Sequence, residues 1–161
     1  MTTDLDLAWL AGFVDGDGCI HMNVNDSPVT PPRKSYIVCG IIVSNTSIPA
    51  IERVKSIMSS LIGREVRYTA RAVRGYRPIY NWKIKRMDEV RAVLTALLPY
   101  LVAKREQADT MLAYLDRKVP FARTGEDFSE FAEKMKHLNR RYSPGEWLPA
   151  RDRTASTGSA G

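Results

Sequence analysis

The feature that most constrains this chain is a nine-residue stretch near its amino end, residues 10–18, which reads LAGFVDGDG. Residues 5–14 are largely apolar and lack proline, which predicts a short buried helix that the run at residues 15–18 then breaks. The carboxylates of Asp15 and Asp17 at a helix C-terminus are electrostatically unfavourable, because that end carries partial negative charge. The pattern therefore predicts that a positive group binds there, and a divalent cation is the first candidate.

Two glycines of this stretch, Gly12 and Gly16, lie four residues apart and hence on one face of the predicted helix. A glycine inside a helix costs about 1 kcal/mol relative to alanine, a cost that close approach of a second backbone explains. The segment is too short to span a bilayer. The spacing favours a close-packed pair of soluble helices, although a buried helix followed by an Asp-Gly turn stays open as the simpler alternative.

Residues 10–18 resemble the motif of the LAGLIDADG homing endonucleases. The matches are Leu10, Ala11, Gly12, Asp15, Asp17 and Gly18. Residues 99–108, PYLVAKREQA, resemble a second pattern of this family, Pro-Phe-Leu-x-x-Lys-x-x-Gln-Ala. The motif occurs once, so the resemblance is to the single-motif, homodimeric members, and it covers roughly residues 5–140.

The apolar patterning predicts two β-hairpins interleaved with helices. Alternation predicts strands at residues 19–25, 66–71 and 80–85, and helical spacing predicts helices at residues 51–61, 90–98, 108–115 and 124–138. Residues 36–44 are β-branched and apolar, which predicts a further strand, but their periodicity is poor, and only the family register implies which of them face outward. With the first helix this is the family's αββαββα half-unit, an α+β fold whose saddle-shaped antiparallel sheet carries helices on one face. We expect one domain over residues 1–149 and a flexible tail over residues 150–161.

The charge of the chain points to a polyanionic partner. The net charge is +6, the isoelectric point is near 9.5, and arginines outnumber lysines 16 to 8. Nucleic acid is favoured over a membrane surface, because no lipid-seeking helix occurs. No secretory signal precedes the domain, which predicts an intracellular protein of a prokaryote, an archaeon or an organelle. Cys19 and Cys39 form neither a disulfide framework nor a zinc site, and both are expected to be buried.

The second hairpin concentrates this charge. Residues 64–86 hold eight basic residues and one acid, Glu65. Strict alternation places the basic side chains on one face of a two-stranded ribbon, and such a ribbon fits a DNA major groove. A merely solvated charged surface is the alternative.

The resemblance assigns the active-site roles. It implies that Asp17 binds the metal, with the Gly16 carbonyl as a further ligand, that Lys104 is the basic active-site residue, and that Asp15 is structural and ends the helix. Asn45 falls where a chloroplast-intron member has a water-positioning glutamine, while helix capping is an equal alternative. For Lys104 the alternative is a surface lysine in a helix N-terminal turn.

One position departs from the family pattern. Pro49 stands where the chloroplast-intron member carries an active-site arginine, so this cation is either missing or comes from elsewhere, for example from Arg53.

The candidate DNA contacts follow from the outward register of the two hairpins and from the family's carboxy-terminal loop. Arginine pairs well with guanine and asparagine with adenine, whereas contacts to phosphate set affinity. The candidates are His21, Asn23, Asn25, Ser27, Thr30 and Tyr36 in the first hairpin, Arg67, Thr69, Arg71, Asn81, Lys83 and Lys85 in the second, and Arg140, Arg141 and Ser143 after the last helix.

Together these observations predict a site-specific homing endonuclease. We expect Mg2+, with Mn2+ as a substitute, to support hydrolysis of both strands of a long, roughly palindromic DNA target, as intron homing requires. The dimer would form through Gly12 and Gly16, and neither a membrane nor a small-molecule substrate is expected. The rival is a DNA-binding regulator or RNA-splicing maturase of the same fold that does not cleave. A generic RNA-binding domain is disfavoured, because the hairpin aromatics fall on the apolar face.

Overall fold

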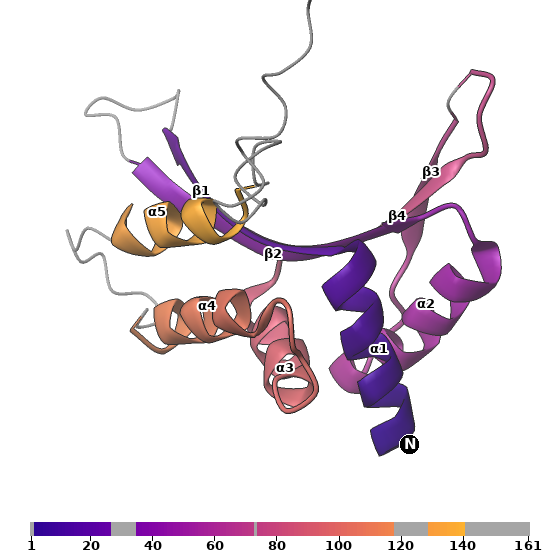
Figure 1. Ribbon diagram of the computed structural model, residues 1–161, viewed down its shortest axis with the longest axis horizontal. Helices are drawn as coiled ribbons and strands as arrows, with labels where there is room; N and C mark the ends of the chain where they lie inside the picture. Colours follow the sequence, from indigo (N-terminus) through magenta and orange to yellow (C-terminus); the bar gives the residue numbers. More distant parts are fainter. Residues whose placement is uncertain (1, 27–34, 73, 118–128, 141–161) are drawn as a thin grey trace, which may run out of the picture.

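The computed structural model describes residues 2–26, 35–72, 74–117 and 129–140 of the chain. Helices and strands alternate along it as an α+β fold, which confirms the predicted class (Figure 1). In chain order the elements are α1 (Asp4–Asp17), β1 (Gly18–Asp26), β2 (Ser35–Asn45), α2 (Ile48–Ile62), β3 (Tyr68–Arg71), β4 (Ile79–Ile84), α3 (Met87–Leu97), α4 (Arg105–Arg117) and α5 (Ser129–Leu138).

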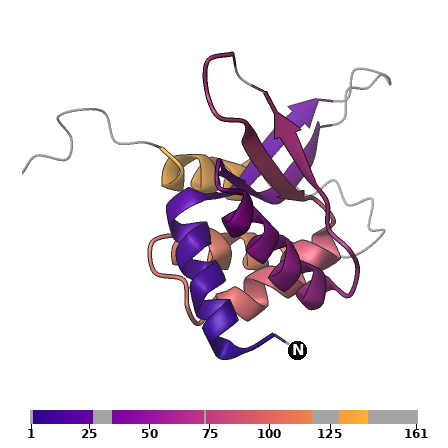
Figure 2. The same ribbon diagram turned by 90° about the vertical axis from the view of Figure 1, so that its right-hand side faces the viewer.

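The four strands form one antiparallel sheet in the order β1-β2-β4-β3, so that the two hairpins meet where β2 pairs with β4. The sheet curves, and its two ends rise away from the helices, which lie on the convex side (Figure 1). Turned by 90°, the β3–β4 hairpin projects from the body on the side opposite the amino end of α1 (Figure 2). The concave face thus stays free of helices among the described residues.

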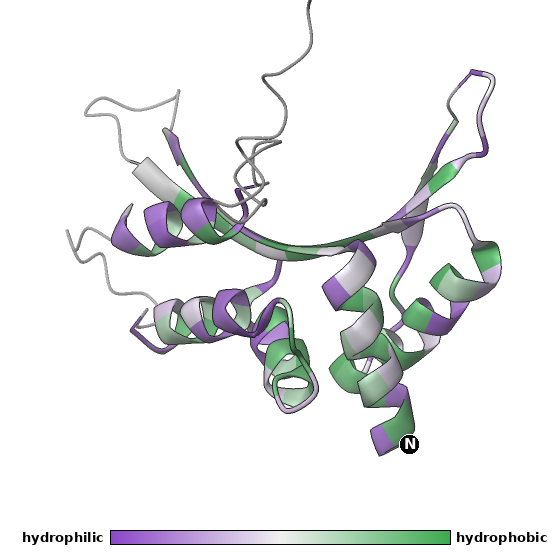
Figure 3. Cartoon of the chain, viewed as in Figure 1, coloured by the Kyte–Doolittle hydropathy of each residue, from purple (hydrophilic) through white to green (hydrophobic). Residues whose placement is uncertain are grey.

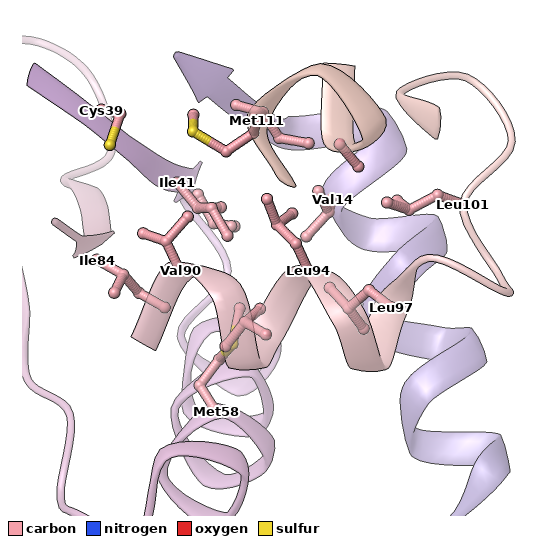
Figure 4. Packing of buried hydrophobic residues seen from close by; sticks show 14 of the residues in the cluster. Val14, Cys39, Ile41, Met58, Ile84, Val90, Leu94, Leu97, Leu101 and Met111 are labelled. Carbon is pink, nitrogen blue, oxygen red and sulfur yellow. The ribbon is translucent and has the colours of Figure 1, made fainter. Parts of the chain in front are cut away.

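The core lies between the sheet and the helices. Along β1 and β2 the residues that face the helices are buried, for example Ile20, Met22 and Ile41, and Trp82 of β4 is fully buried beside them. The hydropathy colouring shows green patches on the inner sides of the helices and purple on their outer sides (Figure 3). The buried face of α3 supplies three more core residues, Val90, Leu94 and Leu97, whose spacing matches the helical repeat (Figure 4).

The first helix begins directly after a capping residue, Thr3, but it ends later than expected. Thr3 caps it in a reciprocal capping box with Asp6. The predicted break at residues 15–18 is wrong in its position, since the helix continues through Asp17 and ends at Gly18. The reason is tertiary, because the Asp15 carboxylate that we expected to end the helix is hydrogen-bonded by another segment, as described below.

Three smaller expectations also change. Strand β3 starts at Tyr68 rather than at residue 66, and α3 begins at Met87 rather than at residue 90. Cys39 is buried as expected, but Cys19 is exposed. Cys19 directly precedes the inward residue Ile20, so alternation turns it toward the concave face. Within the described ranges, no helix combines the length and the apolar character needed to cross a bilayer.

At Gly40 of β2 the backbone of the second hairpin approaches closely. A Cβ at this position would overlap the carbonyl oxygen of Ile84 and would lie 3.0 Å from Cε1 of His21. The contact with Ile84 is a backbone contact, and a backbone contact relaxes less easily than the end of a flexible side chain. The junction of β2 with β4 therefore requires glycine here.

We expect Gly40→Ala to lower the free energy of unfolding by roughly 1–3 kcal/mol, because overpacking forces the backbone of the junction apart. Urea unfolding followed by circular dichroism measures the loss. Val38→Ala, two residues away on the same face of β2, is the matched control and should cost less. Equal or smaller destabilisation by Gly40→Ala would contradict this explanation.

Candidate active site and nucleic-acid interface

The carboxyl end of α1 meets the segment that precedes α4. The Asp15 carboxylate accepts hydrogen bonds from the backbone N–H groups of Val102 and Ala103 through Oδ2, at 2.8 and 3.1 Å, and from the N–H of Lys104 through Oδ1, at 2.8 Å. The Lys104 carbonyl accepts the first helical hydrogen bond of α4, from Ala108. These three N–H groups therefore stand ahead of the helix, where an anion is favourable.

Lys104 completes the contact in the opposite direction. Its Nζ donates to the carbonyl oxygen of Asp15, in the last turn of α1, where the carbonyls lack intrahelical partners and a cation is favourable. The side chain is partly buried. The alternative of a surface lysine in an N-terminal turn is thus wrong, because the ammonium group lies at the C-terminal end of a different helix.

Asp17 is the exposed carboxylate at this end of α1. Asn45, the last residue of β2, donates from Nδ2 to Oδ2 of Asp17 at 2.6 Å, and its Oδ1 accepts from the backbone N–H of Ser47 at 2.7 Å. The orientation of the amide follows from these partners, since a carboxylate only accepts and an N–H only donates. Asn45 therefore contacts Asp17 and the backbone of Ser47, and Ser47 rather than Asn45 is the N-cap residue of α2. The water-positioning role of Asn45 stays a prediction.

Arg53 does not take the place of the active-site arginine that the family member carries at the position of Pro49. Its guanidinium lies 3.5 Å from Oδ1 of Asp6 and 4.4 Å from the ring centroid of Trp9. Asp6 precedes Asp17 by eleven residues of α1, or about 16 Å along a helix. The suggestion of Arg53 as the active-site cation is therefore wrong, because Trp9 and Asp6 hold it near the amino end of α1.

The outward residues of the four strands lie in rows across the concave face. His21 pairs with Gly40 in one row, and in the next Cys19 and Lys83 flank Ile42. A third row joins Ser44 to Asn81 and Asn81 to Thr69. The register thus brings together most of the candidates on the strands, namely His21, Asn23, Asn25, Thr69, Asn81 and Lys83.

The remaining candidates have different positions. Arg71 is exposed at the end of β3, Arg67 and Lys85 are exposed just outside the strands, and Arg140 is exposed after α5. Tyr36 pairs with Asn25 in the register of the first hairpin. Four further candidates lie outside the described residues: Ser27, Thr30, Arg141 and Ser143.

Two residues of this face were not among the sequence-based candidates. Ser44 donates from Oγ to Oδ1 of Asn81 at 2.7 Å, in the row nearest to Asn45. Cys19 lies beside Ile42 on the same face, and Lys83 lies on the other side of Ile42. The signal that would have found both is alternation, since Ser44 continues the outward set of β2 and Cys19 precedes His21 by two residues.

Side chains that could bind a metal ion are few in the described part of the chain. Among its described residues, no group of three or more His, Cys, Asp or Glu side chains is placed to hold a metal ion. The oxygen donors at the end of α1 are the exposed Asp17 carboxylate and carbonyls of the last helical turn, including that of Gly16. Hard oxygen donors of this kind suit Mg2+, which needs one or two carboxylates and keeps several waters.

His21 has an environment that disfavours the charged imidazolium. Burial and the nearby charges of Lys85 and Lys83 lower the pKa of His21 from its usual value. Its buried Nδ1 has no hydrogen-bond partner among the described residues. His21 therefore presents a neutral ring to the concave face near pH 7.

The lowered pKa of His21 predicts that acid weakens the fold. The unfolded chain takes up a proton on His21 at a higher pH than the folded chain, so this contribution to stability is lost as the pH falls below about 6.5. The urea midpoint should drop more between pH 7.5 and pH 5 in wild type than in His21→Gln. The control, His137→Gln, removes an exposed histidine from α5. An equal drop of the urea midpoint in His21→Gln and His137→Gln would contradict the expectation.

No family model and no curated protein sequence matches the chain. The homing endonuclease I-CvuI, solved in complex with a DNA target in the presence of Mg, matches with a TM-score of 0.68 and 25% identity over 86% of this chain and 84% of that chain.

Two more distant structures share the fold. The group I intron-encoded homing endonuclease I-CeuI, complexed with DNA, matches with a TM-score of 0.55 and 15% identity over 72% of this chain and 56% of its own. The archaeal intron-encoded homing endonuclease I-Vdi141I, also complexed with DNA, matches with a TM-score of 0.54 and 10% identity over 84% of this chain and 97% of its own. The resemblance carried by residues 10–18 and 99–108 is thereby confirmed, and the chain has the fold of the LAGLIDADG homing endonucleases.

Proposed function

We propose that this chain is one subunit of a homodimeric, metal-dependent endonuclease that cuts both strands of a long, roughly palindromic DNA target. The observation that carries the proposal is the position of Asp17. Its exposed carboxylate stands at the carboxyl end of α1, directly before the first residue of β1. Lys104 and Asn45 lie at the same end of the helix.

The concave face suits the surface of duplex DNA. It is curved, it lies opposite the helices, and its outward rows carry amides and ammonium groups such as those of Asn81 and Lys83. Exposed arginines extend it along the β3–β4 hairpin. Amides and guanidinium groups read base edges in the major groove, and lysines also bind phosphates. The Ser44 hydroxyl donates a hydrogen bond to Oδ1 of Asn81, so the NH2 group of Asn81 is left as the donor toward DNA.

A second copy of the chain explains the glycines of α1. Gly12 and Gly16 are exposed, and a Cβ added at either would meet nothing within 4 Å, so packing within the chain does not require glycine there. On the same helix Leu5 is 81% exposed. Pairing two such helices about a twofold axis would bury this strip and place the two Asp17 carboxylates together. A twofold protein reads an approximately palindromic site.

The residues of the proposed site divide the chemistry among them. Bound Mg2+ would neutralise phosphoryl charge and supply an activated water. Asp17 and its copy would hold it, with the Gly16 carbonyl as a further oxygen donor. The Lys104 ammonium would stabilise negative charge that develops on the phosphate. Asn45 keeps the Asp17 carboxylate oriented from the start of α2.

The test of this function is cleavage of a palindrome-biased random duplex library with Mg2+. Wild type should cut a long, roughly symmetric sequence, and Asp17→Asn should bind the recovered target but lose cleavage by at least about a thousandfold, because the metal-binding charge is gone. Asp109→Asn, which removes an exposed carboxylate from α4, is the matched control and should cut normally. Specific binding without cutting by wild type, in Mg2+ and in Mn2+, would reject the enzyme and favour a regulator or maturase.

The dimer has its own test. Gly12→Arg should convert the dimer to a monomer in sedimentation experiments, because a long charged side chain cannot fit between two close helices. Ser60→Arg, on the exposed side of α2, adds the same charge away from the interface and is the control. A wild-type chain that stays monomeric at micromolar concentration, alone and on the target DNA, would contradict the proposed assembly.

A further inference from the structure

Asp15 is an acidic motif residue to which the proposed reaction gives no chemical role. Two of its groups bind the same residue, Lys104. The Asp15 carboxylate accepts the Lys104 backbone N–H at 2.8 Å, and the Asp15 carbonyl accepts the Lys104 Nζ. One residue of α1 therefore holds both the main chain and the ammonium group of Lys104.

The two contacts restrain different freedoms of the lysine. The N–H bonds to Val102, Ala103 and Lys104 fix the segment from which the side chain starts. The hydrogen bond from Lys104 Nζ to the Asp15 carbonyl fixes the position of the ammonium group. This carbonyl lies two residues before Asp17 on α1. A lysine stem is flexible and carries large rotamer entropy, so an unrestrained ammonium group would spend little time beside Asp17.

The contact also balances charge at both helix ends. Asp15 brings a negative charge to the C-terminal end of α1, which is unfavourable alone, and Lys104 brings a positive charge to the start of α4, which is unfavourable alone. Paired in this way, each charge faces the helix end that favours it. The sequence separation of 89 residues makes this a specific tertiary contact rather than local capping.

We propose that Asp15 is a positioning residue, which acts in cleavage through Lys104 and neither binds metal nor touches DNA. This inference rests on the proposed endonuclease function. The opposing view is that Asp15 only stabilises the packing of α1 against the segment before α4. The two views differ in whether loss of Asp15 and loss of Lys104 have independent effects on the reaction.

A double-mutant cycle separates them. Asp15→Asn, Lys104→Ala and the double variant are compared with wild type by single-turnover cleavage and by DNA binding in Ca2+. We expect Asp15→Asn to slow cleavage by about tenfold to a hundredfold, as displacement of a catalytic group by about 1 Å does, with little change in Kd. The double variant should be no slower than Lys104→Ala. Effects that multiply in the double variant would overturn the proposal.

Two further variants control for stability and charge. Thr3→Ala removes the cap at the other end of α1, so it weakens the same helix without touching Lys104, and it should cut at the wild-type rate. Asp15→Glu keeps the carboxylate and should recover part of the rate lost in Asp15→Asn. An equal loss of rate in Thr3→Ala and Asp15→Asn would show that helix stability alone is responsible.

A second measurement does not depend on cleavage. Amide hydrogen exchange at residues 102–104, and acylation of the Lys104 amine followed by mass spectrometry, should both be faster in Asp15→Asn than in wild type or Thr3→Ala. Unchanged exchange and acylation would overturn the positioning role. If wild type cuts no DNA, the proposed function fails, and this measurement still decides whether Asp15 holds Lys104.

Discussion

The reciprocal contact between the carboxyl end of α1 and the start of α4 is the interaction on which the candidate site depends. Asp15 satisfies three N–H groups that precede α4, and Lys104 satisfies a carbonyl that α1 leaves free. Each charge alone would oppose the dipole of its own helix, and together they join segments that are 89 residues apart. With this contact in place α1 continues to Asp17, and the edge strand β1 begins at the next residue, Gly18.

The sheet supplies the other half of the arrangement. Because side chains alternate along a strand, burial of Ile20 and Met22 requires His21 and Asn23 to face the concave side. Strand pairing aligns the outward residues of neighbouring strands in the same way. Gly40 allows β2 and β4 to join the two hairpins into one curved surface. The same curved sheet therefore buries an apolar core on one side and offers polar and basic groups on the other.

Local patterning predicted the parts that local rules govern. Period-two alternation predicts three of the four strands and their outward residues, and the motif predicts the helix and its two aspartates. The outward set of the strand at residues 36–44 comes from the family register, because both of its faces are apolar. Tertiary contacts decided the rest. Nothing near Asp15 in the sequence indicates that residues 102–104 will meet its charge, and Arg53 was misassigned because its partners, Asp6 and Trp9, lie on another helix. Cys19 is exposed for a simpler reason: cysteine is usually buried, but this one alternates with the buried Ile20 and so faces the opposite side of the sheet.

If one chain holds half of a catalytic site, a dimer with a single intact Asp17 should not cut DNA, and a mixed dimer provides this case. Differently tagged wild-type and Asp17→Asn chains are mixed, the dimer with one of each is purified on the recovered target, and strand cleavage is measured. If the two Asp17 carboxylates act together, the mixed dimer binds DNA like wild type but loses cleavage of both strands. Efficient double-strand cleavage by the mixed dimer would contradict the account, because a single Asp17 would then suffice.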